Sequence, residues 1–174
     1  MEKVLEILKL AVEKESMRKA AYLEAAANTT NPLAKATFEE LAKDEDKHAV
    51  YLKAYYDKQV ANEGWPAHGE IVEDEDSMAV VQQIFKYANQ MIDQAGACSE
   101  DLTEVYEAAL AAENESIHLY TDAIAHTDDA NAKAFFGMLV EAEKRHAKVL
   151  TETQDYLDDT SKWFFDEEMW IVEG

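Results

Sequence analysis

Two stretches of this 174-residue chain carry the same pattern of residues, 98 positions apart. When residues 11–52 are laid over residues 109–150, 15 of the 42 positions are identical. Helical composition alone would give scattered Ala and Leu matches, whereas these matches include aromatic and charged residues in register, such as Phe38 with Phe136. Self-similarity of this kind indicates a duplicated structural unit. We therefore expect a chain built from two copies of one design.

Each copy reads as a helical hairpin. Apolar residues recur at spacings of three and four, which predicts amphipathic helices over residues 2–28, 32–58, 99–126 and 130–158. Asn31 followed by Pro32 predicts the cap and the first residue of the second helix. Ser99 is the predicted cap of the third helix, and residues 127–129 form the predicted turn before the fourth. At about 1.5 Å per residue, each helix spans roughly 40 Å.

The predicted fold is all-α, a single domain over residues 1–174 in which two repeated hairpins form a four-helix bundle. The first repeat covers about 2–58 and the second about 99–158. Residues 59–98 between them form a linker with an extra, shorter helix. Residues 159–174 form a short apolar C-terminal tail rich in Trp and Phe. We expect this tail to be buried, either on the bundle or in a dimer contact, because large apolar groups gathered in one place rarely stay exposed.

The charge of the chain excludes several kinds of partner. Acidic residues outnumber basic ones by 37 to 16, which gives a formal net charge of −21. Nucleic acids and anionic membranes are bound through Lys and Arg, so we expect neither as a partner. The single cysteine, Cys98, excludes an intramolecular disulfide and any zinc or iron–sulfur site built from several cysteines of one chain. Since no apolar run approaches about 18 residues, we expect a soluble, cytoplasmic protein.

The repeat also aligns residues that can bind metal. Each copy holds a Glu-x6-Tyr pair followed by a Glu-x-x-His pair, and the four pairs are Glu15–Tyr22, Glu45–His48, Glu113–Tyr120 and Glu143–His146. Residues three or seven apart lie on one face of a helix. Thirty residues separate the two glutamates of each copy, so an antiparallel hairpin places them at similar heights. Four carboxylates and two imidazoles would then meet at the middle of the bundle.

Burying these groups together requires cations. An uncompensated buried carboxylate is costly, and like charges held close together repel one another. Two divalent ions would neutralise four carboxylates, and two neutral imidazoles would complete the coordination. One Glu from each of two helices, with Glu-x-x-His from each of the other two, is the ligand arrangement of di-iron carboxylate bundles. Carboxylate oxygen with imidazole nitrogen favours two iron ions, with manganese as the alternative, over copper or a closed zinc site.

Each of these residues also has a simpler interpretation. A single Glu-x-x-His pair is common on solvated helix faces, so the metal hypothesis depends on finding two copies in register. Tyr22 and Tyr120 are either core aromatics or donors of hydrogen bonds to ligating carboxylates. Glu115 lies about 200° from Glu113 on a regular helix, so it would join the site only at a π-bulge. The histidines outside the repeat are expected at the surface.

Together, the four pairs resemble the rubrerythrin branch of the ferritin-like di-iron proteins, over about residues 1–157. The resemblance implies a ferritin-like bundle that reduces hydrogen peroxide or dioxygen. The iron ligands that it implies are Glu45 and Glu143 as bridges, with Glu15, His48, Glu113 and His146 as terminal ligands. Rubrerythrins also carry an additional glutamate on the third helix, three residues after its first ligand. The residue at that position here is Ser116.

The resemblance has consequences for partners as well. Rubrerythrins typically end in a rubredoxin module with paired Cys-x-x-Cys iron ligands. A chain with one cysteine would need a separate electron donor, rubredoxin-like or another reductase, and we expect a homodimer. Two other functions stay open on sequence alone. One is a non-catalytic module that binds, stores or senses iron, and the other is a metal-free helical interaction domain whose acidic residues form solvated faces.

Overall fold

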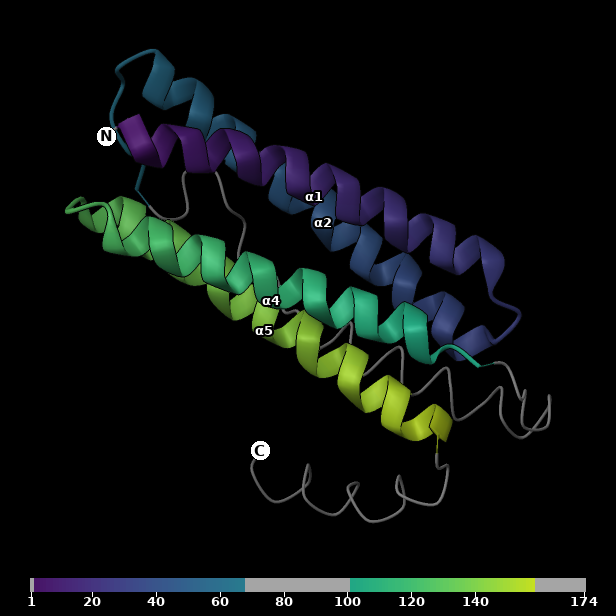
Figure 1. The fold of residues 1–174 in the computed structure, drawn as a ribbon. Coiled ribbons are helices and arrows are strands. Elements are labelled where there is room, and N and C mark those ends of the chain that lie inside the picture. Colours follow the sequence, from purple (N-terminus) through teal and green to yellow (C-terminus); the bar gives the residue numbers. More distant parts are fainter. Residues whose placement is uncertain (1, 68–100, 159–174) are drawn as a thin grey trace.

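The computed structural model describes residues 2–67 and 101–158 (Figure 1). These residues form α1 (Glu2–Asn28), α2 (Pro32–Val60), α4 (Thr103–Ala125) and α5 (Ala130–Asp158). The all-α class and the four long helices predicted from the sequence are confirmed, and neither described range contains a strand. The predicted linker helix, Cys98 and the apolar tail lie outside the described residues.

The four helices associate as two hairpins. α1 packs along α2 and α4 packs along α5, whereas fewer contacts join α1 to α4 and α2 to α5. Figure 1 shows the α1–α2 hairpin lying over the α4–α5 hairpin. The start of α1 shares an apolar cluster with the end of α4, so these neighbours run antiparallel. The arrangement is the four-helix bundle of two repeated hairpins that the sequence predicts.

Equivalent residues of the repeat cap the second helix of each hairpin. The Asn31 side chain accepts hydrogen bonds from the backbone N–H groups of Leu33 and Ala34, at 2.9 and 3.1 Å. Asp129, 98 positions later, accepts from the two corresponding N–H groups at the start of α5. Such caps satisfy N–H groups that have no partner within the helix. The predicted boundaries at these two helix starts are therefore confirmed.

The prediction for the start of α4 was wrong. The helix begins at Thr103 rather than directly after Ser99. Leu102 precedes it with φ −107° and ψ 7°, and its side chain makes no capping hydrogen bond. Instead, the Asp101 carboxylate accepts a hydrogen bond from the Thr103 N–H group at 3.1 Å. A short acidic side chain that bonds two residues ahead offers the backbone a turn in place of helix at this point.

Two apolar clusters fill opposite ends of the bundle. The first joins the starts of α1 and α5 to the ends of α2 and α4, and its large members include Leu8, Leu52, Phe135 and Phe136. The second joins the other ends of the helices, and its large members include Tyr22, Phe38, Tyr106 and Leu150. On every helix, the predicted ligand residues lie between the positions that contribute to these clusters. The middle of the bundle is thus flanked by apolar packing on both sides.

Among the helices of residues 2–67 and 101–158, none is long and apolar enough to cross a lipid bilayer.

The equivalent aromatics of the two repeats should contribute similarly to stability. Phe38→Ala and Phe136→Ala each remove a fully buried ring, so each should lower the free energy of unfolding by about 3–5 kcal/mol. Urea-induced unfolding followed by circular dichroism measures this change. Leu23→Ala is the matched control, because Leu23 is 49 % exposed and its truncation should change stability by no more than about 0.5 kcal/mol. A cost below about 1 kcal/mol for either Phe would contradict the assigned core.

Candidate metal centre

All six side chains predicted as metal ligands meet in the middle of the bundle. Each hairpin contributes one Glu from its first helix and a Glu-x-x-His pair from its second. The four carboxylates are 0 % exposed, and both imidazoles are buried. The contributing residues are Glu15 on α1, Glu45 and His48 on α2, Glu113 on α4, and Glu143 and His146 on α5.

Three carboxylate oxygens face the imidazole of His48. Its Nδ1 atom lies 3.8 Å from Glu15 Oε2 and 3.9 Å from Glu45 Oε2. The same nitrogen lies 3.3 Å from Glu143 Oε1. We call this group the His48 half-site. Carboxylate oxygens that converge with an imidazole nitrogen form a donor set suited to a divalent iron or manganese ion.

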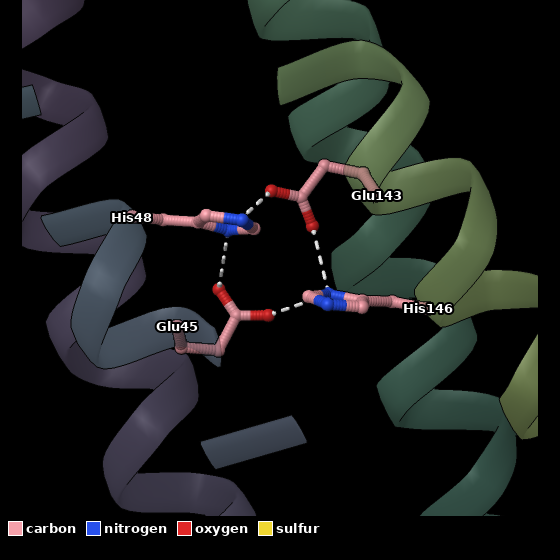
Figure 2. Close-up of side chains that lie close together, drawn as sticks. All are labelled: Glu45, His48, Glu143 and His146. Carbon is pink, nitrogen blue, oxygen red and sulfur yellow. Dashed lines mark ion pairs between the residues drawn. The ribbon is translucent and has the colours of Figure 1, made fainter. Parts of the chain in front are cut away.

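A second group of the same kind surrounds His146. Its Nδ1 atom lies 3.0 Å from Glu45 Oε1, 3.4 Å from Glu143 Oε2 and 3.7 Å from Glu113 Oε1. We call this group the His146 half-site. Glu45 and Glu143 thus present one oxygen to each half-site, as Figure 2 shows. Within the two Glu-x-x-His pairs, one ligand atom from each residue lies within 4.8 Å of the other three.

Several buried atoms of the cluster make no hydrogen bond. In the described part of the chain, each ligand residue has one such atom: Glu15 Oε2, Glu45 Oε1, His48 Nδ1, Glu113 Oε2, Glu143 Oε2 and His146 Nδ1. A buried polar atom without a partner costs about 1–3 kcal/mol, so native structures rarely leave one. Metal ions would accept the lone pairs of these atoms. The residues present therefore fit a metal centre.

The cluster holds protons as well as negative charge. Burial raises the pKa of Glu45, and the nearby charges of Glu143 and Glu15 raise it further, to about 8. Burial would lower the pKa of His48, but its interactions with the carboxylates of Glu143 and Glu15 raise it to about 10. Glu45 and His48 therefore both carry a proton at neutral pH. A metal ion that binds here must displace these protons.

The tyrosines of the Glu-x6-Tyr pairs connect the two hairpins. The Tyr22 hydroxyl on α1 donates a hydrogen bond to Glu113 Oε1 on α4. The Tyr120 hydroxyl on α4 donates one to Glu15 Oε1 on α1. Tyr22 also stacks on Phe38, with ring centroids 5.9 Å apart. The two interpretations left open by the sequence therefore hold together, because each ring packs in the core while its hydroxyl orients a carboxylate of the cluster.

A positive charge also lies inside the cluster. Arg18 is 6 % exposed, and its Nη2 atom lies 2.5 Å from Glu15 Oε1, 2.9 Å from Glu45 Oε2 and 3.5 Å from Glu143 Oε1. Its Nη1 atom donates a hydrogen bond to the Ser116 hydroxyl. Burial would lower the pKa of Arg18, but the surrounding carboxylates raise it above its ordinary value, so the guanidinium stays charged.

Sequence reasoning missed two residues that touch this cluster. Arg18 follows Glu15 by three positions, so helix periodicity alone places it on the ligand face. The comparison of the repeats by their identities hid it, because its equivalent residue is Ser116. Asp44 is the second: its Oδ2 atom lies 3.6 Å from Nε2 of His146, on the side of the ring away from the cluster. Its contact crosses from α2 to α5, and no spacing within one helix predicts it.

Glu115 does not join the metal cluster. Its side chain is 67 % exposed and pairs with Lys14 at 2.8 Å on the surface. α4 continues through this position as a regular α-helix, so the π-bulge that would redirect Glu115 does not occur. His118 and His126 are exposed, as expected, whereas His68, for which the same was predicted, lies outside the described residues.

The chain was compared with known protein families, curated proteins and solved structures. A family model described as Rubrerythrin matches residues 6–153, a range that contains all six residues of the cluster. The chain has no match among the curated proteins or among the solved structures.

Metal affinity should fall as the pH is lowered from about 8 to about 6. The pKa values of Glu45 (about 8) and His48 (about 10) lie above their ordinary values, so both groups bind protons in competition with the ion throughout this window. Each displaced proton should weaken Mn²⁺ binding about tenfold per pH unit. Isothermal titration calorimetry in buffers of different ionisation enthalpy counts the protons released. Affinity that does not change with pH would contradict the proton occupancy described here.

Removing either tyrosine hydroxyl should weaken metal binding. Tyr22→Phe and Tyr120→Phe keep the buried rings but remove the donors that orient Glu113 and Glu15. We expect Mn²⁺ affinity to fall about tenfold in each variant. Competition with a chromophoric chelator measures it, and Tyr56→Phe, at a half-buried position away from the cluster, is the control. Affinities within twofold of the unmodified protein would show that the hydroxyls have no such role.

Proposed function

The chain belongs to the rubrerythrin family, and we propose that its buried cluster binds two iron ions and uses them to reduce hydrogen peroxide or dioxygen. Manganese is the alternative metal. The observation that carries the proposal is the doubled half-site, in which each imidazole faces three carboxylate oxygens. Glu45 and Glu143 present one oxygen to each imidazole, and such a carboxylate can bridge two ions.

The chain's own residues would hold and shield the ions. Glu45 and Glu143 would bridge them, while Glu15 with His48 and Glu113 with His146 would complete the coordination. The tyrosine hydroxyls fix the orientation of the two terminal carboxylates. The apolar clusters on both sides limit access of water to the site. When bound, two ferrous ions supply Lewis acidity and the two electrons that convert hydrogen peroxide and two protons into two water molecules.

Turnover also needs a source of electrons. Rubredoxin-type iron sites use four cysteines, and this sequence holds only Cys98. We therefore propose that a separate protein, rubredoxin-like or another reductase, donates the electrons. As an independent expectation, we propose that the chain assembles as a homodimer.

A second function is supported by two residues near the cluster. Ser116 stands where rubrerythrins carry an additional glutamate, and Arg18 places a fixed positive charge beside the carboxylates. Both features favour a protein that binds iron and is oxidised once, as in storage or sensing, rather than one that cycles. Repeated consumption of peroxide in the presence of a reductant distinguishes the enzyme from the binding module.

The test is an anaerobic titration with Fe²⁺ followed by addition of peroxide. We expect iron uptake and then an absorption band of oxidised, bridged iron. Glu45→Ala with Glu143→Ala should weaken iron binding by more than about 100-fold, because outer contacts alone contribute about 10–100-fold. Glu115→Ala is the control, since this carboxylate is exposed and outside the cluster. Absence of uptake by the unmodified protein, or equal uptake by the double variant, would reject the proposal.

A further inference from the structure

The two half-sites share one design but differ in the charged groups around them. We propose that they bind metal unequally: the His146 half-site takes the first ion, and Arg18 holds back the second ion from the His48 half-site. The inference rests on the proposed metal centre and adds an order of filling to it. Three observations support it: the contacts of Arg18, the Asp44 carboxylate beside His146 and the net charge of the cluster.

Arg18 engages the oxygens of the His48 half-site. Its Nη2 atom contacts Glu45 Oε2 at 2.9 Å and Glu143 Oε1 at 3.5 Å. On the two carboxylates that we propose as bridges, these are the oxygens that face His48. Nη2 also lies 2.5 Å from Glu15 Oε1, on the terminal carboxylate of the same half-site. An ion that binds here must share or break these charge-assisted contacts, and it is also repelled by the guanidinium.

The oxygens of the His146 half-site are less engaged. Glu45 Oε1 and Glu143 Oε2 face His146, and neither accepts a hydrogen bond within the described residues. Arg18 approaches the terminal carboxylate of this half-site only through Nε, which lies 3.9 Å from Glu113 Oε2. The other oxygen, Glu113 Oε1, is the one that faces His146. An ion could therefore bind beside His146 without displacing the guanidinium.

A second difference between the repeats acts in the same direction. Asp44 lies 3.6 Å from Nε2 of His146, where a carboxylate orients the ring and strengthens Nδ1 as a ligand. The position equivalent to Asp44 in the second repeat is Ala142, which has no polar side chain to support His48. His146 thus has a supporting carboxylate that the repeat does not provide for His48.

The net charge of the cluster also separates the two binding steps. Once the binding of metal has displaced the protons, the four carboxylates and Arg18 together carry −3. One divalent ion leaves the cluster at −1, whereas a second takes it to +1. Excess charge of either sign is costly in a buried site, so the first ion gains more than the second. Without Arg18, two ions would balance the four carboxylates.

The test replaces Arg18 with serine, because Ser116 occupies the equivalent position of the other repeat. Arg18→Ser and the unmodified protein are titrated with Mn²⁺, and binding is followed by calorimetry and by electron paramagnetic resonance. We expect the unmodified protein to bind one ion at least tenfold more tightly than the second, with a mononuclear six-line spectrum at one equivalent. In Arg18→Ser the two affinities should approach each other, and the spectrum of a coupled pair should appear before two equivalents are added.

Lys19→Ser is the matched control for loss of one positive charge. Lys19 is the next residue on α1, but it pairs with Asp46 on the surface at 2.6 Å and does not touch the cluster. Its titration should match that of the unmodified protein. A closing of the affinity gap in Lys19→Ser as large as that in Arg18→Ser would attribute the effect to overall charge and overturn the assignment to Arg18.

A second pair of variants tests the order of filling without altering Arg18. Glu113→Gln should weaken the first, tight step, because Glu113 belongs to the His146 half-site. Glu15→Gln should leave the tight step within about threefold and weaken the second, because Glu15 belongs to the His48 half-site. Equal loss of the same step in both variants would overturn the inference. So would two ions of equal affinity in the unmodified protein, although that result would leave the proposed function intact, whereas absence of all binding would reject both.

Discussion

Four carboxylates meet in the interior of this bundle, and the positive charge that they require shapes most of what surrounds them. Their oxygens are flanked by apolar clusters rather than by water, so repulsion among them is weakly screened. Three kinds of group compensate this charge: the buried guanidinium of Arg18, the protonated imidazole of His48, and the tyrosine hydroxyls that donate to Glu113 and Glu15. These partners still leave one atom of every ligand residue without a hydrogen bond. Metal ions would supply what is missing.

The sequence predicted the positions of the helices and the ligand cluster because both follow from short-range geometry. A three-residue spacing fixes a shared helix face, and equal 30-residue spacings bring each pair of glutamates level across a hairpin. The start of α4 was misplaced because Asp101 and Ser99 both offer a turn or cap, and only the folded backbone selects between them. The contact of Asp44 with His146 escaped prediction for a different reason, since it depends on how two hairpins dock.

Arg18 lies at a position where the two repeats differ, and such positions are as informative as the identical ones. The identical positions of the two copies hold the shared ligand set. The positions that differ place different charged groups beside the two half-sites. The pairs Arg18 with Ser116 and Asp44 with Ala142 are both such differences, and both lie against the cluster or its imidazoles. In a rubrerythrin-family bundle, a fixed cation beside the carboxylates changes the charge that the metals must balance in every oxidation state.

The hairpins touch each other less than the helices within each hairpin do. Yet each half-site includes one carboxylate oxygen from α2 and one from α5, and each tyrosine hydroxyl donates to a carboxylate of the opposite hairpin. An ion bound by residues of both hairpins would therefore stabilise the interface between them. Loss of the ion should therefore weaken the association of the two hairpins before it unfolds either one.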